Sequence, residues 1–156
     1  MADEQVLARH KAEADVLGHM LTGIMIHSDL VKLYTLIDMP KMADIHTRQV
    51  EEENSYFDML NRWLIKQEGV IIEPVNARRI QVTAKPVTTK PDTYTECAFL
   101  NQHMIEVWHK WETGTKDMYE KMVKDYPDMK VWKKLLGAVT RELWKIERIR
   151  KKYFEV

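Results

Sequence analysis

The chain has 156 residues, of which 45% are hydrophobic and 31% charged, a composition that excludes a disordered chain and is sufficient for a buried core. Basic and acidic residues balance at 24 each, so no excess of positive charge predicts nonspecific binding to nucleic acid. Because the chain has one cysteine (Cys97), no signal-peptide pattern and no apolar run of the roughly 20 residues that span a bilayer, we expect one soluble domain over residues 1–156, in the cytoplasm and without a membrane partner.

Two long helices are predicted in the first half of the chain. Residues 4–37 carry apolar side chains at spacings of three, four and seven residues, the pattern of an amphipathic helix; these are Leu17, Met20, Leu21, Ile24 and Val31. Gly18 and Gly23 predict close packing against a neighbour, because each glycine lowers helix propensity by about 1 kcal/mol. The helix ends before Pro40, a favoured first-turn residue for a second helix that runs to Gly69. So short a link makes the two helices antiparallel neighbours.

The second half of the chain predicts another helical hairpin. Residues 70–91 contain three prolines and no helical periodicity, and about 20 residues are enough to cross the full length of a bundle. A third helix is expected from an N-cap at Asp92 to Tyr126, and a fourth from Asp128 to Phe154. The predicted fold is therefore an all-α four-helix bundle of two antiparallel hairpins joined by a long crossover, which is the ferritin-like connection scheme.

The inward side of the second helix carries polar residues among apolar ones. Gln49 and Glu53 lie on this side, where an acid is unfavourable unless something pairs with it. Antiparallel pairing of the first two helices places His27 level with these residues. The crossover brings Asn101 to the same height, and His46 lies one turn away. The sequence therefore predicts an upper polar layer inside the bundle.

A second polar layer is predicted lower in the bundle, where Glu13, Glu112 and Glu142 all point inward and His10 is nearby. Together the two layers offer nitrogen and oxygen ligands of the kind that suit iron, manganese or zinc. Neither layer contains the doubled Glu-x-x-His of di-iron carboxylate proteins. The one such spacing, at residues 106–109, is expected on a solvated face.

A metal-free interpretation stays open for both layers. Inward glutamates near helix ends can pair with lysine or arginine, and a buried His27 can donate a hydrogen bond to Gln49 or to a backbone carbonyl. His19 and His103 are expected on the outside of their helices, at the surface.

Three short segments of the chain match the motifs of a known family. Residues 39–42 (MPKM), 56–69 (YFDMLNRWLIKQEG) and 142–144 (ELW) resemble, in order, the start of the second helix, its end, and the tryptophan-bearing last helix of Dps-type mini-ferritins, within the ferritin-like superfamily. The resemblance implies a homo-oligomer that binds, oxidises or stores iron and limits oxidative damage. Some members of this family also compact DNA with lysine-rich tails. This chain has no basic tail of that kind, and residues 148–152 (RIRKK) resemble one only weakly.

The ligands of the family's own iron site are mostly not matched. In the family, histidines and carboxylates of the first two helices hold iron between subunits. Asp58 matches one of these acids, but Met39, Ala43 and Arg62 stand where the family has other ligands. Because a guanidinium cannot ligate iron and repels it, the resemblance implies an interfacial ferroxidase site that is largely lost.

Two hypotheses therefore follow from the sequence. The first is an iron-handling relative of the mini-ferritins, with ferroxidase-type oxidoreductase activity at a site that retains metal; its candidate ligands are His27, His46, Glu53, Asp58, Glu13, Glu112 and Glu142. Iron is the expected cofactor, with manganese or zinc as alternatives. The second is a diverged bundle that binds no metal and keeps the oligomer as a structural or interaction protein.

Overall fold

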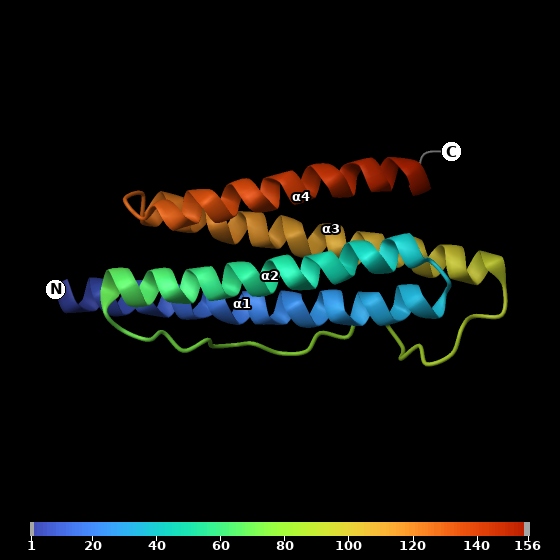
Figure 1. Cartoon of the computed structure of the whole chain (residues 1–156), viewed down its shortest axis with the longest axis horizontal. Helices are drawn as coiled ribbons and strands as arrows, with labels where there is room; N and C mark the ends of the chain where they lie inside the picture. Colours follow the sequence, from blue (N-terminus) through green and yellow to red (C-terminus); the bar gives the residue numbers. More distant parts are fainter. Residues whose placement is uncertain (1, 155–156) are drawn as a thin grey trace.

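The computed structural model describes residues 2–154 and confirms an all-α architecture of four helices, with no strand in that range. The helices are α1 (Ala2–Leu36), α2 (Pro40–Glu68), α3 (Tyr94–Asp125) and α4 (Lys130–Phe154). Figure 1 shows α1 and α2 as one antiparallel hairpin and α3 and α4 as another. Residues 69–93 run back along the molecule between them, so α2 and α3 point in the same direction (Figure 1). No helix within the described range is apolar over a stretch long enough to cross a membrane.

The helix ends follow local chemistry, with one correction. Pro40 occupies the first turn of α2, and Gly69 ends the helix in the left-handed conformation, at a φ of 69°, with its N–H donating to Ile65 O. The N-cap of α3 is Thr93 rather than Asp92, because the Thr93 hydroxyl accepts the N–H of Glu96 at 3.1 Å. The Thr-x-x-Glu pattern is a capping box, so the sequence contained this signal.

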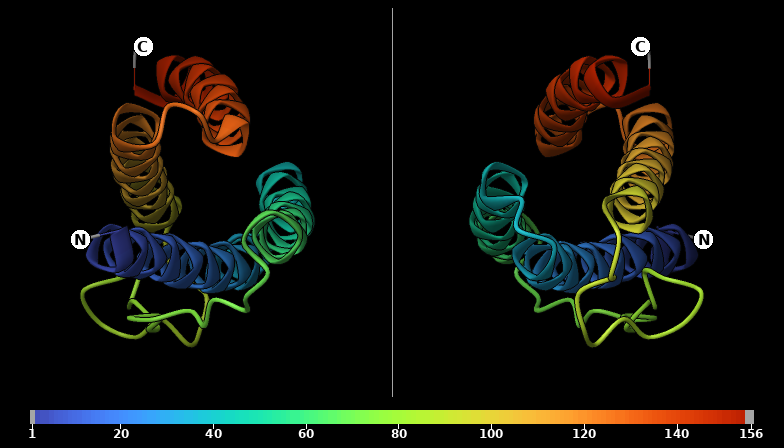
Figure 2. Two further views of the ribbon diagram at one scale, coloured as in Figure 1. Left: turned by 90° about the vertical axis from the view of Figure 1, so that its left-hand side faces the viewer. Right: turned by 90° about the vertical axis from the view of Figure 1, so that its right-hand side faces the viewer.

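The crossover packs directly on the outer side of α1, as the end-on views in Figure 2 show. The N–H of Val75 donates to Ala14 O at 3.1 Å, and the N–H of Arg78 donates to the Thr22 hydroxyl at 3.1 Å. A Cβ placed on Gly18 would lie 1.7 Å from Val75 O. The close packing predicted from Gly18 is therefore confirmed, and the neighbour is a backbone segment rather than a helix.

Replacing Gly18 by alanine is expected to lower the free energy of unfolding by at least about 2 kcal/mol, because the crossover backbone must move to admit the methyl group. Gly114→Ala is the matched control, since no described atom lies within 4 Å of a Cβ there. That control should gain up to about 1 kcal/mol of helix propensity. Urea unfolding followed by circular dichroism measures both, and equal midpoints for the two variants would contradict the contact.

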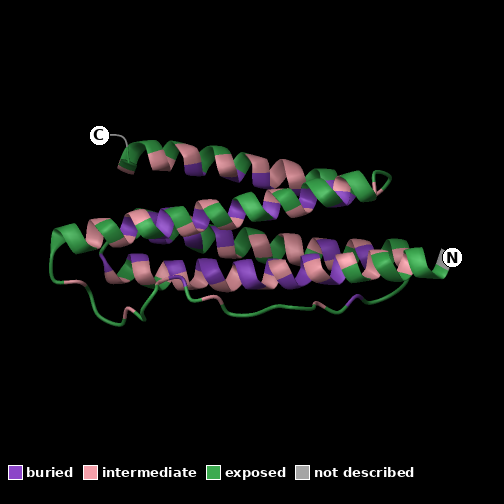
Figure 3. Cartoon of the chain, turned by 180° about the vertical axis from the view of Figure 1, so that it is seen from behind, coloured by how far each residue is buried: buried purple, intermediate pink, exposed green. Residues whose placement is uncertain are grey.

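The predicted core of α1 is partly wrong. Leu21, Ile24 and Val31 are only half-buried, whereas Leu30 and Tyr34 are both 0% exposed. Because α1 is covered by other helices on one side and by the crossover on the other, its buried surface is wider than a single amphipathic stripe. Figure 3 shows the resulting pattern of buried and half-buried residues along α1.

The core consists of two hydrophobic clusters, one toward each end of the bundle. All four helices carry polar side chains near the boundary between the two clusters, and these side chains are buried or half-buried. We call this set the central polar layer: His27 on α1, Gln49 and Glu53 on α2, Glu112 on α3 and Glu142 on α4.

Candidate metal centre

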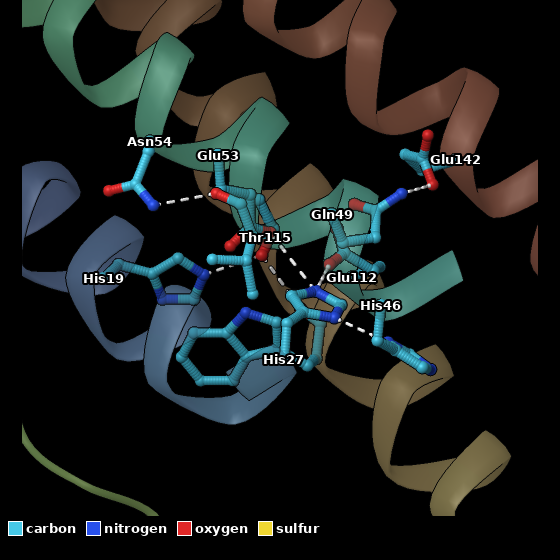
Figure 4. Close-up of polar contacts among 11 residues, drawn as sticks. His19, His27, His46, Gln49, Glu53, Asn54, Glu112, Thr115 and Glu142 are labelled. Atoms are coloured by element: carbon cyan, nitrogen blue, oxygen red, sulfur yellow. Dashed lines mark hydrogen bonds and ion pairs between the residues drawn. The ribbon is translucent and has the colours of Figure 1, made fainter. Parts of the chain in front are cut away.

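Three residues from three helices meet inside the central polar layer (Figure 4). His27 Nε2 lies 3.2 Å from Glu112 Oε1 and 3.3 Å from Glu53 Oε1. His27 is 0% exposed and Glu112 is 4% exposed, so bulk water does not solvate this contact. We call His27, Glu53 and Glu112 the central triad; their ligand atoms all lie within 4.8 Å of one another.

These separations match the spacing of ligands around a transition-metal ion. Ligand atoms bound at about 2.0–2.2 Å lie roughly 3.0–3.5 Å from one another on the edges of an octahedron or tetrahedron. The two contacts of His27 Nε2 fall within this interval. One imidazole and two carboxylates form a ligand set that suits iron, manganese or zinc.

A second histidine orients the first. His27 Nδ1 lies 2.8 Å from His46 Nδ1, so one of these two nitrogens carries the proton between them. A metal on His27 Nε2 requires the proton on His27 Nδ1, which then donates to His46. His46 is fully buried between the rings of Tyr34 and Trp108, at centroid distances of 5.4 Å and 4.5 Å. His46 therefore lies behind the candidate ligand and holds its ring in place.

The triad holds two acid groups against one imidazole in a largely buried place. Burial lowers the pKa of His27, but the carboxylates of Glu53 and Glu112 outweigh it and raise that pKa to about 10. Burial, together with repulsion from Glu53, raises the pKa of Glu112, although His27 acts in the opposite direction. With His27 protonated, the buried Glu112 and the half-buried Glu53 place up to two negative charges against one positive charge. A divalent cation in place of that proton neutralises both carboxylates.

The fourth helix contributes Glu142 to the same layer without joining the triad. Gln49 Nε2 donates to Glu142 Oε2, and Lys145 Nζ donates to Glu142 Oε1 at 3.1 Å. Glu53, Glu112 and Glu142 all line one cavity of about 150 Å³, to which all four helices contribute. A cavity of about this size holds a benzene-sized molecule. The triad therefore has space beside it for a small reactant.

One residue predicted at the surface, His19, lines this cavity instead. His19 does not lie at the surface as expected: its ring stacks on Trp111 at a centroid distance of 4.0 Å, and burial lowers its pKa to about 4. The Thr115 hydroxyl donates to Trp111 O and lies 2.6 Å from His19 Nε2, so His19 Nε2 carries a proton and donates it to Thr115. A Cβ on Gly23 would lie 2.9 Å from Trp111 Nε1, so the glycine leaves room for this stack.

The predicted composition of the two polar layers is wrong in register. Glu112, expected in the lower layer with Glu13, instead joins His27, and Asn101 lies nearer the start of α3, where its Oδ1 accepts the Tyr34 hydroxyl at 2.9 Å. Asn101 and Glu112 are separated by about 16 Å of helix. The error arose because α3 begins beyond the end of α1 (Figure 1), which shifts every α3 residue along the bundle.

The remaining candidates lie outside the central triad. Asp58 is exposed on α2 and lines a shallow depression together with Arg62. Glu13 clusters with His10 and with Glu68, the last residue of α2, which the sequence did not single out. Glu68 directly precedes Gly69, where the sequence predicts the end of the helix, but the sequence gives no sign of its partners Glu13 and His10 on α1.

The predicted solvated face of α3 carries ion pairs. His109 Nε2 lies 3.0 Å from Glu147 Oε1, and Glu106 Oε1 accepts from Arg150 Nε at 2.9 Å. These pairs tie α3 to α4 outside the cavity, as expected for residues that are not ligands.

Comparison of the chain with protein-family models, curated proteins and solved structures finds no match. The resemblance to mini-ferritins therefore stays a prediction.

Proposed function

We propose that this chain is a ferritin-like metal-binding protein whose metal centre lies within each bundle rather than between subunits. The observation that supports it is the buried central triad, in which one imidazole nitrogen lies 3.2 Å and 3.3 Å from two carboxylates of other helices. His27, Glu53 and Glu112 would hold the ion, and His46 would orient His27.

Iron(II) is the ion that the resemblance favours, as the substrate of an oxidation. Three protein ligands leave coordination positions for water or an oxidant, and carboxylates stabilise the ferric product over the ferrous ion. Each iron(II) gives one electron to dioxygen or hydrogen peroxide. Two iron(II) ions reduce one hydrogen peroxide, with two protons, to two waters. The cavity beside the triad is large enough to admit either oxidant.

The test is the rate of iron(II) oxidation, followed by ferric absorbance under air and with added peroxide. The wild-type protein should oxidise iron(II) faster than buffer, and Glu53→Ala should slow the reaction at least about tenfold, because it removes a ligand. Asp58→Ala is the matched control on the exposed face of the same helix and should leave the rate unchanged. Equal rates with buffer and with protein would overturn the ferroxidase proposal.

The assembly proposed for this function is a homo-oligomer, as the resemblance implies. Light scattering should then report a particle mass several times the 18.6 kDa of one chain. A monomeric mass would remove the storage shell from the proposal and leave metal binding within one bundle.

The second candidate is a metal-free bundle with a structural or interaction role. It is favoured by one observation: 3.2 Å and 3.3 Å are also hydrogen-bond or ion-pair distances for a protonated His27. In that case the proton is the only cation of the triad. Elemental analysis of protein purified without added metal separates the two, since a metal-free bundle would contain no stoichiometric transition metal.

A further inference from the structure

A second cluster of metal-ligating side chains lies near the start of α1, away from the central triad. His10 and Glu13 come from α1 and Glu68 is the last residue of α2; one ligand atom of each lies within 4.8 Å of the others. Glu13 precedes His27 by 14 residues, which is about 21 Å of helix, so no side chain can serve both clusters. Any ion held here is separate from the proposed iron site.

The polar atoms of this cluster are buried without partners. Glu13 is 0% exposed, and neither of its carboxylate oxygens has a hydrogen-bond partner among the described residues. Glu68 Oε2 also has no hydrogen-bond partner, and His10 Nε2 lies 3.6 Å from Glu68 Oε1, beyond hydrogen-bond distance. Buried polar atoms are almost always paired, so four unpaired atoms in one place indicate a missing partner. Three oxygens and an imidazole nitrogen need a partner that is positively charged.

We propose that His10, Glu13 and Glu68 form a second cation site, which binds a divalent transition ion such as zinc or manganese and fastens the beginning of α1 to the end of α2. An imidazole and two carboxylates are the ligands such ions take in proteins. The ion would bridge the two helices where α2 ends and the crossover begins at Gly69. Its role is structural, because the ion would join the two helices of one hairpin near their ends.

Arg9 is the competitor of this ion. Its guanidinium contacts Glu68 Oε1 and leaves Glu68 Oε2 and both oxygens of Glu13 unpaired. The Arg9 side chain is 29% exposed, so it can turn into solvent when an ion arrives. Two carboxylates and one divalent ion are then neutral together, whereas the present arrangement has two carboxylates and one guanidinium. Arg9→Gln should therefore bind the ion several-fold more tightly than wild type.

The test is the number of zinc ions bound per chain at pH 7.5, measured by equilibrium dialysis and elemental analysis. Wild type should bind two, Glu13→Gln one, Glu53→Gln one and the double variant none. His10→Gln, whose side chain is already 24% exposed, provides an independent loss of the same ion if Glu13→Gln does not fold. Wild-type stoichiometry in His10→Gln or in a folded Glu13→Gln would overturn the second site. Loss confined to Glu53→Gln would support the central triad and overturn the second site, whereas loss confined to Glu13→Gln and His10→Gln would support the second site alone.

Hydrogen exchange distinguishes a bridging ion from a surface ion. In Glu53→Gln, where only the second site remains, zinc should slow amide exchange over residues 3–12 at least about fivefold, because the start of α1 can no longer fray. Adding Glu13→Gln should abolish the slowing. If zinc leaves the amide exchange rates of Glu53→Gln unchanged, any bound zinc is an adventitious ion only. That result would overturn the proposal that the ion fastens α1 to α2.

Discussion

Replacing His27 by leucine in the metal-free protein is expected to lower the free energy of unfolding by about 3–5 kcal/mol. The substitution leaves Glu53 and Glu112 without their buried partner, and an uncompensated buried charge is the most costly outcome of breaking an ion pair. Urea unfolding in the presence of a chelator measures the loss. Added zinc at about 100 times its Kd should stabilise wild type by about 2.7 kcal/mol and this variant far less.

The control for His27→Leu is the triple variant that also carries Glu53→Gln and Glu112→Gln. This variant removes both charges along with the histidine, so it should recover a large part of the stability that His27→Leu loses. If His27→Leu alone unfolds within about 1 kcal/mol of wild type, the triad does not carry the buried charges assigned to it. If the triple variant is no more stable than His27→Leu, lost packing rather than charge is the cause.

The affinity of the central triad for a divalent ion is expected to rise about tenfold per pH unit between pH 6.5 and 8.5. The pKa of His27 is raised from 6.5 to about 10, so the metal-free protein holds a proton on His27 throughout this range. Each ion must displace that proton, and its apparent affinity therefore increases as pH rises toward 10. Competition with a chromophoric chelator measures the affinity, and the proton released per ion can be counted with a pH indicator.

The same proton determines how stability changes with pH. Because the folded-state pKa of His27 is raised, its contribution is fully present below pH 6.5 and disappears as pH rises to about 10. Bound metal should flatten this dependence, since the bound His27 has no proton on Nε2 to lose.

His109→Gln, on the α3–α4 face, is the control for the affinity measurement and should keep the wild-type slope of affinity against pH. An affinity that is constant from pH 6.5 to 8.5 would contradict displacement of a proton from His27.

The burial of Glu13 gives the second cluster a different pH signature. Burial, together with repulsion from Glu68, raises the pKa of Glu13 from 4.5 to about 8, with Arg9 acting in the opposite direction. Stability from this group is therefore present below pH 4.5 and is lost as pH rises to about 8. Glu13→Gln, which cannot ionise, should be more stable than wild type at pH 8 in the absence of metal. Thermal unfolding at pH 5 and pH 8 measures the difference.

Local sequence determined much of the architecture. Apolar periodicity, the proline at position 40 and the glycine at position 69 were sufficient to predict the α1–α2 hairpin, because these signals act within a few residues of where they occur. Gly18 correctly indicated a close neighbour. The inward placement of His27, Glu53 and Glu112 also followed from helical periodicity, which is a property of each helix alone.

Only the tertiary structure decided which of these polar residues meet. The register of α3 against α1 depends on how far the crossover carries the chain past the end of the first hairpin, and no local pattern encodes that distance. Glu112 therefore joined His27 in place of Asn101, and Glu13 met Glu68 instead of Glu112. A shift of three turns leaves every helix and its inward face unchanged but replaces an amide by a carboxylate beside a buried histidine. The physical reason is that helix formation is local, whereas the packing of helices depends on contacts between residues far apart in the chain.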